Sequence, residues 1–176
     1  SATSLAAALN EIDSAPDRVE APPPALPAQQ LQGLRVLLVD DVSTNRLVAS
    51  EILMDQGARV DEAENGREAV DKVLQGGPWD VVLMDVQMPV MNGLDATRAI
   101  RADARFAALP IFAMTAFALD EERERCLQSG MDGFLTKPID PDKVIATLAA
   151  IAARVDRQAP PAAPATTATA PAASAA

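Results

Sequence analysis

The stretch LRVLLVDD at residues 34–41 is a short apolar run that ends in two aspartates, Asp40 and Asp41. Three further stretches carry a polar residue at the same end of an apolar run: WDVVLMD (79–85) with Asp85, PIFAMT (110–115) with Thr115, and FLTKP (134–138) with Lys137. Continuous apolar runs are typical of strands in a parallel sheet whose two faces are both covered. The carboxyl ends of such strands meet at one edge, where open α/β sheets bind ligands. The sequence therefore predicts that these five polar groups converge.

Strand and helix signals alternate through the middle of the chain. The expected strands cover residues 35–39, 58–62, 81–84, 111–114 and 133–136, and the expected helices cover 44–56, 66–75, 93–102, 119–129 and 141–154. Gly57 and Gly130 follow two of these helices, where a left-handed cap is often needed. With right-handed crossovers, the alternation predicts an α/β fold of five βα units around a parallel sheet.

The two ends of the chain have a different composition. Residues 14–32 and 158–176 are rich in alanine and proline and have few large apolar side chains. We expect disordered linkers over 1–32 and 156–176 around one folded domain at 33–155. Leu5, Leu9 and Ile12 have helical spacing, but the segment is too short to form a stable isolated helix. Linkers on both sides suggest an internal piece of a larger protein.

Charge and composition exclude several classes of function. The chain has 25 acidic and 15 basic side chains and a net charge of -10, which disfavours nucleic acid as a partner. No apolar stretch reaches the roughly 18 residues of a membrane span, and no signal peptide opens the chain, so we expect a cytoplasmic segment without membrane contact. Cys126 is the only cysteine, which rules out an intrachain disulfide and argues against a metal-thiolate site.

The predicted cluster of aspartates indicates a particular chemistry. Neighbouring carboxylates raise one another's proton affinity unless a cation joins them, and three of them point to a hard divalent ion such as Mg²⁺. A carboxylate beside Mg²⁺ is also a competent nucleophile towards a phosphoryl group. Taken alone, Asp40 and Asp41 could equally cap the helix that follows them.

Four strings resemble one known family, the receiver domain of response regulators, and most closely the receivers of hybrid sensor histidine kinases. These strings are VDDVSTNR (39–46), LMDVQMPVMNGLDATRAIR (83–101), FAMTAF (112–117) and GMDGFLTKPI (130–139). The resemblance implies a flavodoxin-like, doubly wound (βα)₅ fold with the strand order 2-1-3-4-5. It also implies that the domain catalyses its own phosphorylation and slow dephosphorylation.

The same resemblance assigns roles to the site residues. It implies that Asp85 is the phosphoacceptor and, with Asp40 and Asp41, a ligand of Mg²⁺. The backbone carbonyl of Gln87 matches the remaining protein ligand of the metal in the family.

Further roles follow from the resemblance at the last two strands. Thr115 matches a hydroxyl that contacts the phosphoryl group, and Lys137 matches the cation beside it. Phe134 matches the aromatic residue that follows the threonine when the domain switches. Pro138 resembles the family's cis-proline.

The chain contains no histidine. The resemblance implies a phosphohistidine donor, which must therefore lie in another part of the parent protein or in another chain. We expect a phosphorelay between a histidine kinase core and a histidine phosphotransfer domain, within a hybrid kinase that is itself anchored to a membrane or free of it. Two alternatives are a Mg²⁺-dependent phosphohydrolase of the haloacid dehalogenase type and an interaction module that takes no phosphate. The first normally has two aspartates spaced two apart, which Asp40 and Asp41 are not.

The expected helix at 44–56 suggests a docking surface for this donor. Helical periodicity predicts a buried face of Val48, Ala49, Ile52, Leu53 and Gln56 opposite Ser43, Leu47, Ser50 and Met54. Leu47 and Met54 would then be exposed near the site and, with Pro138, would contact the donor. The resemblance also places the side chain of Phe117, two residues past Thr115, around the approach to Asp85. We expect it to lie over the site and slow hydrolysis, unless it packs on the next helix.

Overall fold

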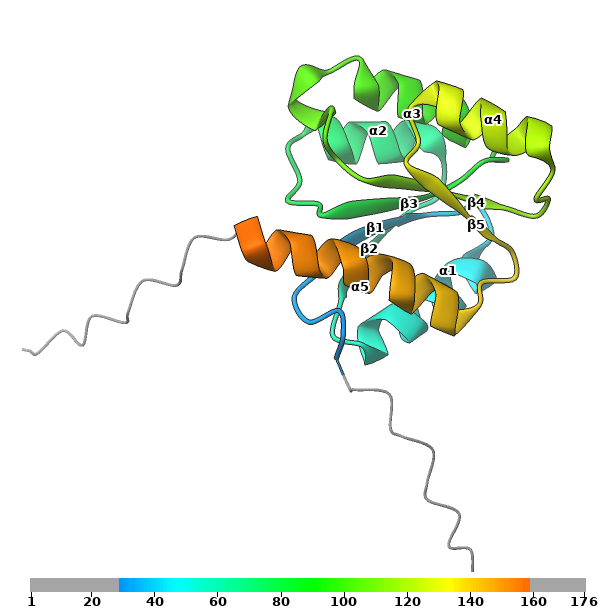
Figure 1. Cartoon of the computed structure of the whole chain (residues 1–176). Coiled ribbons are helices and arrows are strands. Elements are labelled where there is room, and N and C mark those ends of the chain that lie inside the picture. Colours follow the sequence, from blue (N-terminus) through cyan, green and yellow to red (C-terminus); the bar gives the residue numbers. More distant parts are fainter. Residues whose placement is uncertain (1–28, 159–176) are drawn as a thin grey trace, which may run out of the picture.

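The computed structural model describes residues 29–158, in which strands and helices alternate along the chain (Figure 1). The strands are β1 (Arg35–Val39), β2 (Arg59–Ala63), β3 (Val81–Asp85), β4 (Ile111–Thr115) and β5 (Gly133–Thr136). The helices are α1 (Ser43–Asp55), α2 (Gly66–Leu74), α3 (Gly93–Arg101), the short 3₁₀ helix η1 (Ala104–Phe106), α4 (Asp120–Ser129) and α5 (Pro141–Gln158). Most of the predicted linkers, residues 1–28 with Leu5, Leu9 and Ile12 and residues 159–176, lie outside the described residues.

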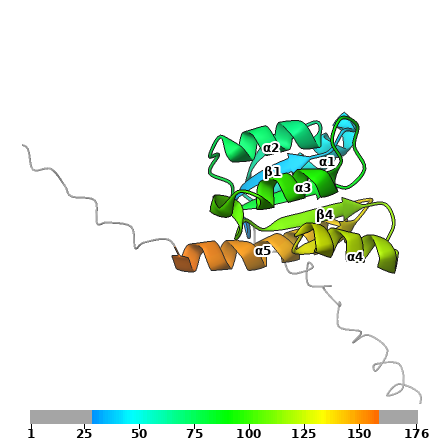
Figure 2. The same cartoon turned by 90° about the horizontal axis from the view of Figure 1, so that it is seen from above.

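The five strands form one parallel sheet in the order β2-β1-β3-β4-β5, which confirms the predicted flavodoxin-like (βα)₅ fold. Helices α1 and α5 cover one face of the sheet, and α2, α3 and α4 cover the other (Figure 1). Seen from above, α2, α3 and α4 lie side by side (Figure 2). No helix within residues 29–158 is long and apolar enough to cross a membrane.

Each face of the sheet has its own hydrophobic core, because successive strand residues point to opposite sides. On β1, Val36 and Leu38 pack with α1 and α5, whereas Leu37 and Val39 pack with α2 and α3. Since both faces are buried, these strands read as continuous apolar runs in the sequence. The edge strand β2 is an exception, because Arg59 and Asp61 are exposed on it. In the other strands the polar residues fall mainly at the ends, and those at the carboxyl ends gather at one edge of the sheet.

The helix ends follow local chemistry. The side chains of Asn65 and Asn92 cap α2 and α3 by accepting hydrogen bonds from backbone N–H groups in the first turn. Gly57 and Gly130 follow α1 and α4 with positive φ angles of 88° and 101°, as the sequence predicts. All observed boundaries but one agree with the predicted ones to within one residue.

Three boundaries differ in ways that matter. Strands β3 and β4 each include one more residue than predicted, so that Asp85 and Thr115 are the last residues of their strands. Helix α5 continues to Gln158, since the next residue that disfavours a helix is Pro160.

The folded segment also begins earlier than predicted. Leu31 is fully buried in the core, and its N–H donates to the carbonyl of Gln56. The expected domain bounds 33 and 155 therefore fall inside the described folded segment.

The predicted faces of α1 are wrong in two places. Ser50 is buried rather than exposed because its hydroxyl donates to Glu62 on β2 at 2.8 Å. Val48 is exposed rather than buried, and Arg46 takes its place on the inner face. Leu47 and Met54 are exposed as predicted.

Candidate functional site

The carboxyl edge of the sheet brings the predicted site residues together. Asp40 and Asp41 follow β1, Asp85 ends the adjacent strand β3, Thr115 ends β4, and Lys137 follows β5. All of them except Asp40 line a cavity of about 190 Å³, whose other lining residues are Val86, Gln87 and Ala116. Asp40 lies behind this cavity and reaches it through its contact with Lys137. The convergence predicted from the strand ends is thus observed.

Three carboxylates form the acidic part of the site. One oxygen each from Asp40, Asp41 and Asp85 lies within 4.8 Å of the others. Asp40 and Asp85 are buried, and Asp41 faces solvent. Hard divalent cations prefer oxygen ligands of this kind, so the donor set fits Mg²⁺. Because Asp41 is exposed, an ion bound by these carboxylates would be accessible from solvent.

Lys137 connects two of these carboxylates. Its ammonium nitrogen lies 2.7 Å from Asp40 and 2.8 Å from Asp85, and the peptide bond to Pro138 is cis. Burial raises the pKa of Asp85, and the charge of Asp40 adds to this effect, against the opposing influence of Lys137. Burial lowers the pKa of Lys137, but its bonds to Asp40 and Asp85 outweigh this and raise it. The site therefore keeps Lys137 protonated and retains an excess of negative charge that a divalent cation would offset.

Asp40 is held by further groups that the sequence prediction missed. Its carboxylate accepts a hydrogen bond from the N–H of Val42 at 2.8 Å and from the side-chain amide of Asn45 at 3.3 Å. Its backbone carbonyl accepts from the guanidinium of Arg46 at 2.7 Å. Asn45 and Arg46 come four and five residues after Asp41 in VDDVSTNR, but Asp40 and Asp41 lie before the start of α1, so helical spacing did not indicate these contacts.

The predicted residues on the loops take different positions. The N–H of Gln87 donates to the Asp85 carboxylate at 3.2 Å, and Gln87 borders the cavity. The hydroxyl of Thr115 donates to the carbonyl of Phe117 at 2.9 Å and accepts from the Phe117 N–H at 3.1 Å. Phe117 itself is exposed and does not line the cavity, so the expectation that its ring lies over the site is wrong. The turn between Thr115 and Phe117 directs the ring to solvent.

The predicted switch residue Phe134 lies on β5 and is half-buried against the core beneath α4. The guanidinium carbon of Arg123, on α4, lies 4.5 Å from the centre of the Phe134 ring. A cation at this distance from a ring face is attracted by it. Phe134 is therefore tied to α4 and not to the acidic cavity.

The predicted docking residues lie beside the site rather than in it. Leu47 and Met54 are exposed on α1, and Pro138 is exposed in the loop after β5. A second cavity of about 450 Å³ separates α1 from this loop, and its lining residues are Leu38, Asp40, Asn45, Val48, Ala49, Met114, Lys137, Pro138 and Ile139. This mostly apolar hollow shares Asp40 and Lys137 with the acidic site.

Comparison with known proteins agrees with the fold and the site residues described above. The family model described as the response regulator receiver domain matches residues 36–149. The sensor protein GacS of Pseudomonas syringae pv. syringae is 51% identical over 108 residues, which are 60% of this chain and 12% of that protein. The chain thus spans about one eighth of the length of this relative.

Two solved structures are similar over most of the described residues. One is the receiver domain of a sensor histidine kinase from Pseudomonas aeruginosa PAO1 with a magnesium ion in its active site cleft. It is 37% identical, with a TM-score of 0.64, over 69% of this chain and 98% of that one. The other is the receiver of Saccharomyces cerevisiae Ssk1, solved with the histidine phosphotransfer protein Ypd1. It is 25% identical, with a TM-score of 0.66, over 70% of this chain and 92% of that one.

The family match covers more than half of the chain and contains four strands in full, all of β1 except Arg35, and all five site residues. It supports the receiver prediction over the alternative of a haloacid dehalogenase-type phosphohydrolase. The chain belongs to the family of response regulator receiver domains, the signalling modules of two-component systems.

Proposed function

We propose that this receiver accepts a phosphoryl group from a phosphohistidine onto Asp85 and relays it to a downstream histidine. The observation that carries this proposal is the arrangement around Asp85, whose buried carboxylate pairs with Lys137 and lies within 4.8 Å of the carboxylate oxygens of Asp40 and Asp41. A structural ion pair alone would not require the additional exposed carboxylate of Asp41. The intact constellation also argues against an interaction module that takes no phosphate.

Mg²⁺ would be held by the carboxylates of Asp40, Asp41 and Asp85 and by the backbone carbonyl of Gln87. When bound, it would supply positive charge next to the phosphoryl oxygens. The protein residues do the remaining work. Lys137 and the N–H of Gln87 hold one oxygen each of Asp85, which orients the carboxylate as a nucleophile. An Asp85 oxygen attacks phosphorus, the bond to the imidazole nitrogen breaks, and an acyl phosphate forms.

The same geometry suggests how phosphorylation changes the domain. The Thr115 hydroxyl now bonds the Phe117 carbonyl, and a phosphoryl group on Asp85 would offer it a stronger, charged acceptor. Loss of the Thr115–Phe117 contact would free the loop between β4 and α4. Phe134 and α4 would move with this loop because Arg123 connects them.

The donor is a protein other than this segment, since no histidine occurs in the 176 residues. The similarity to GacS and to a receiver solved with Ypd1 supports a hybrid histidine kinase as the parent and a histidine phosphotransfer domain as a partner. Leu47, Met54 and Pro138 remain our docking residues, and exposed Val48 joins them. Val48 and Pro138 line the apolar hollow beside Lys137, and Leu47 and Met54 are exposed on the same helix as Val48. A histidine-bearing helix that packs on this surface would bring its phosphate to the acidic cavity.

The acceptor assignment is tested with a small donor. Phosphoramidate or acetyl phosphate with Mg²⁺ should add one phosphoryl group to the wild-type chain, as detected by intact-mass spectrometry. Asp85→Asn should stay unmodified, whereas Asp95→Asn, at an exposed position on α3, should be labelled like the wild type. Full labelling of Asp85→Asn would refute the assignment.

The docking surface is tested with two matched variants. Leu47 on α1 and Leu127 on α4 have the same relative exposure, 58%. Leu47→Asp should slow transfer from a phosphorylated histidine phosphotransfer protein by about tenfold and leave labelling by phosphoramidate unchanged. Leu127→Asp should change neither rate. If Leu47→Asp slowed both donors equally, the surface would have no docking role.

A further inference from the structure

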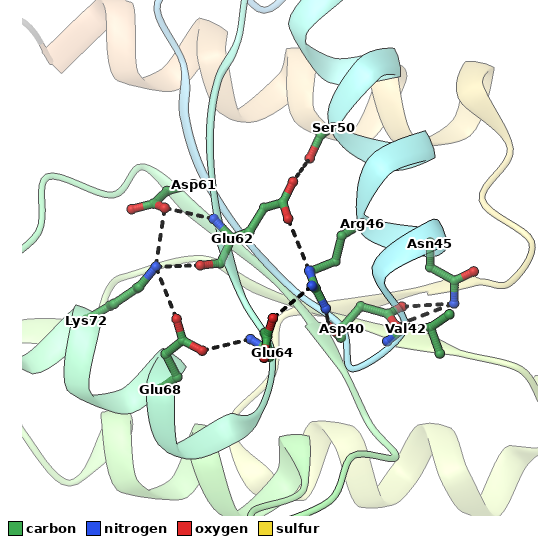
Figure 3. A network of polar contacts seen from close by, with 10 residues as sticks. All are labelled: Asp40, Val42, Asn45, Arg46, Ser50, Asp61, Glu62, Glu64, Glu68 and Lys72. Atoms are coloured by element: carbon green, nitrogen blue, oxygen red, sulfur yellow. Dashed lines mark hydrogen bonds and ion pairs between the residues drawn. The ribbon is translucent and has the colours of Figure 1, made fainter.

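Arg46 on α1 is a buried cation that the proposed chemistry does not use. The residue is only 8% exposed, although arginine is almost never buried without partners. Its side chain points from α1 towards β2 and the end of β1 (Figure 3). Its partners come from two segments of the chain, the residues at the end of β1 and those at the end of β2.

Each nitrogen of the guanidinium has one partner. Nη1 donates to the backbone carbonyl of Asp40 at 2.7 Å, Nε to the Glu62 carboxylate at 3.1 Å, and Nη2 to the Glu64 carboxylate at 3.1 Å. The second oxygen of Glu62 accepts the Ser50 hydroxyl. Arg46 is thus fixed by Glu62 on β2, which Ser50 of α1 also holds, and by Glu64 just after β2, and its one neutral acceptor is the carbonyl that joins Asp40 to Asp41.

This carbonyl matters because it belongs to the peptide unit between the two aspartates. On its other side, Asp40 is held by its N–H, which donates to the carbonyl of Ala63 at 3.2 Å. The Asp40 carboxylate has side-chain and backbone partners of its own. The Asp41 carboxylate has no hydrogen bond or ion pair within the described part of the chain. Its position beside Asp40 and Asp85 is therefore set by the backbone, and Arg46 holds that backbone.

The charge of Arg46 is offset away from the acidic cavity. Glu62 and Glu64 pair with it, and the network continues through Glu68, whose carboxylate accepts the N–H of Glu64 and pairs with Lys72 (Figure 3). With two carboxylates against one guanidinium, Arg46 does not neutralise the aspartates that would bind the cation.

We propose that Arg46 is a positioning residue for the cation site, acting through the Asp40 carbonyl to keep the Asp41 carboxylate beside Asp40 and Asp85. This inference rests on the proposed function, in which Asp41 is a Mg²⁺ ligand. A positioning role and a purely electrostatic role for Arg46 predict opposite changes in Mg²⁺ affinity when the residue is replaced. Removing a cation near a metal site without moving its ligands would strengthen Mg²⁺ binding, whereas loss of a positioning contact weakens it.

The test is the dissociation constant for Mg²⁺, measured by isothermal titration calorimetry on the unphosphorylated chain. Arg46→Met should raise this constant about tenfold, as expected when a group that orients a metal ligand is lost. Arg46→Lys should raise it similarly, because one ammonium cannot replace three separately directed donors. Saturating Mg²⁺ should restore most of the labelling rate with phosphoramidate.

Two controls separate positioning from lost stability and from lost charge. Val73→Ala removes buried apolar contacts on α2, and should lower stability yet keep the Mg²⁺ constant within about twofold of wild type. Arg98→Met removes an exposed arginine on α3 and should also leave it unchanged. The inference, but not the proposed function, would be refuted if Arg46→Met bound Mg²⁺ as tightly as the wild type or more tightly. The same holds if Arg46→Lys bound Mg²⁺ with the wild-type dissociation constant. Failure of the wild-type chain to bind Mg²⁺ would instead refute the proposed function, and the inference with it.

Discussion

Gly93, the first residue of α3, lies directly against the acceptor residue. Its N–H donates to the carbonyl of Val86 at 3.0 Å, and its carbonyl accepts the Thr97 hydroxyl at 2.7 Å, so its position is closely determined. A Cβ atom built on Gly93 would lie 2.1 Å from the backbone carbonyl oxygen of Asp85 and 2.9 Å from Cγ of Met84. Real Cβ atoms essentially never approach another heavy atom closer than 3.0 Å, so Gly93→Ala forces α3 and the end of β3 apart.

The loss of stability expected for Gly93→Ala depends on which atom the new methyl group would meet. A side chain could rotate away, but the Asp85 carbonyl belongs to a buried strand. We therefore expect the upper part of the range for overpacking, about 3 kcal/mol of lost stability, in spite of the higher helix propensity of alanine. For a domain of this size the melting temperature should fall by roughly 10 °C. Because the required shift approaches 1 Å at the nucleophile, the labelling rate should fall about 100-fold.

Urea unfolding followed by circular dichroism measures the first effect, and phosphoramidate labelling at saturating Mg²⁺ measures the second. Gly76→Ala is the matched control, since Gly76 has a positive φ of 83° but open space around the new methyl group. It should cost about 1 kcal/mol through backbone strain and leave labelling unchanged. The steric reasoning would be refuted if Gly93→Ala stayed within about 0.5 kcal/mol of wild type and was labelled at a similar rate.

Four further perturbations test other parts of the structure. Val90 is exposed with a positive φ of 68°, so Val90→Gly should stabilise the domain by about 1 kcal/mol in urea unfolding, and a loss would contradict the assigned strain. Lys137→Met should bind Mg²⁺ about tenfold more tightly in calorimetry, because a competing cation is removed, yet be phosphorylated more slowly; weaker binding would contradict this. Phe117→Ala should leave the lifetime of the phosphorylated domain unchanged in a decay assay, and a markedly shorter lifetime would show that the ring does shield the site. Leu148→Ala should cost about 3 kcal/mol, measured by urea unfolding, because the side chain is fully buried between α5 and the sheet; a cost below about 1 kcal/mol would mean that this core is loosely packed.

The sequence by itself determined the class of fold and the contents of the acidic site. Residues of the inner strands β1, β3 and β4 alternate between two buried faces and are nearly all apolar, so the polar groups at the ends of these runs stand out in the sequence. Parallel strands bring such ends to one edge, and for this reason Asp40, Asp85 and Lys137 could be grouped before any coordinates were known. The glycine after α1 could be placed because a left-handed cap is a local requirement.

Only the tertiary structure decided which side chains face inward on α1. Helical periodicity defines which residues share a face, but the polar partners that bury Arg46 and Ser50 come from β2, which no local pattern indicates. The direction of Phe117 likewise depends on two hydrogen bonds in its loop. Contacts between segments far apart in the chain are set by the packing of the whole sheet, and so the residues that orient the site were visible only in three dimensions.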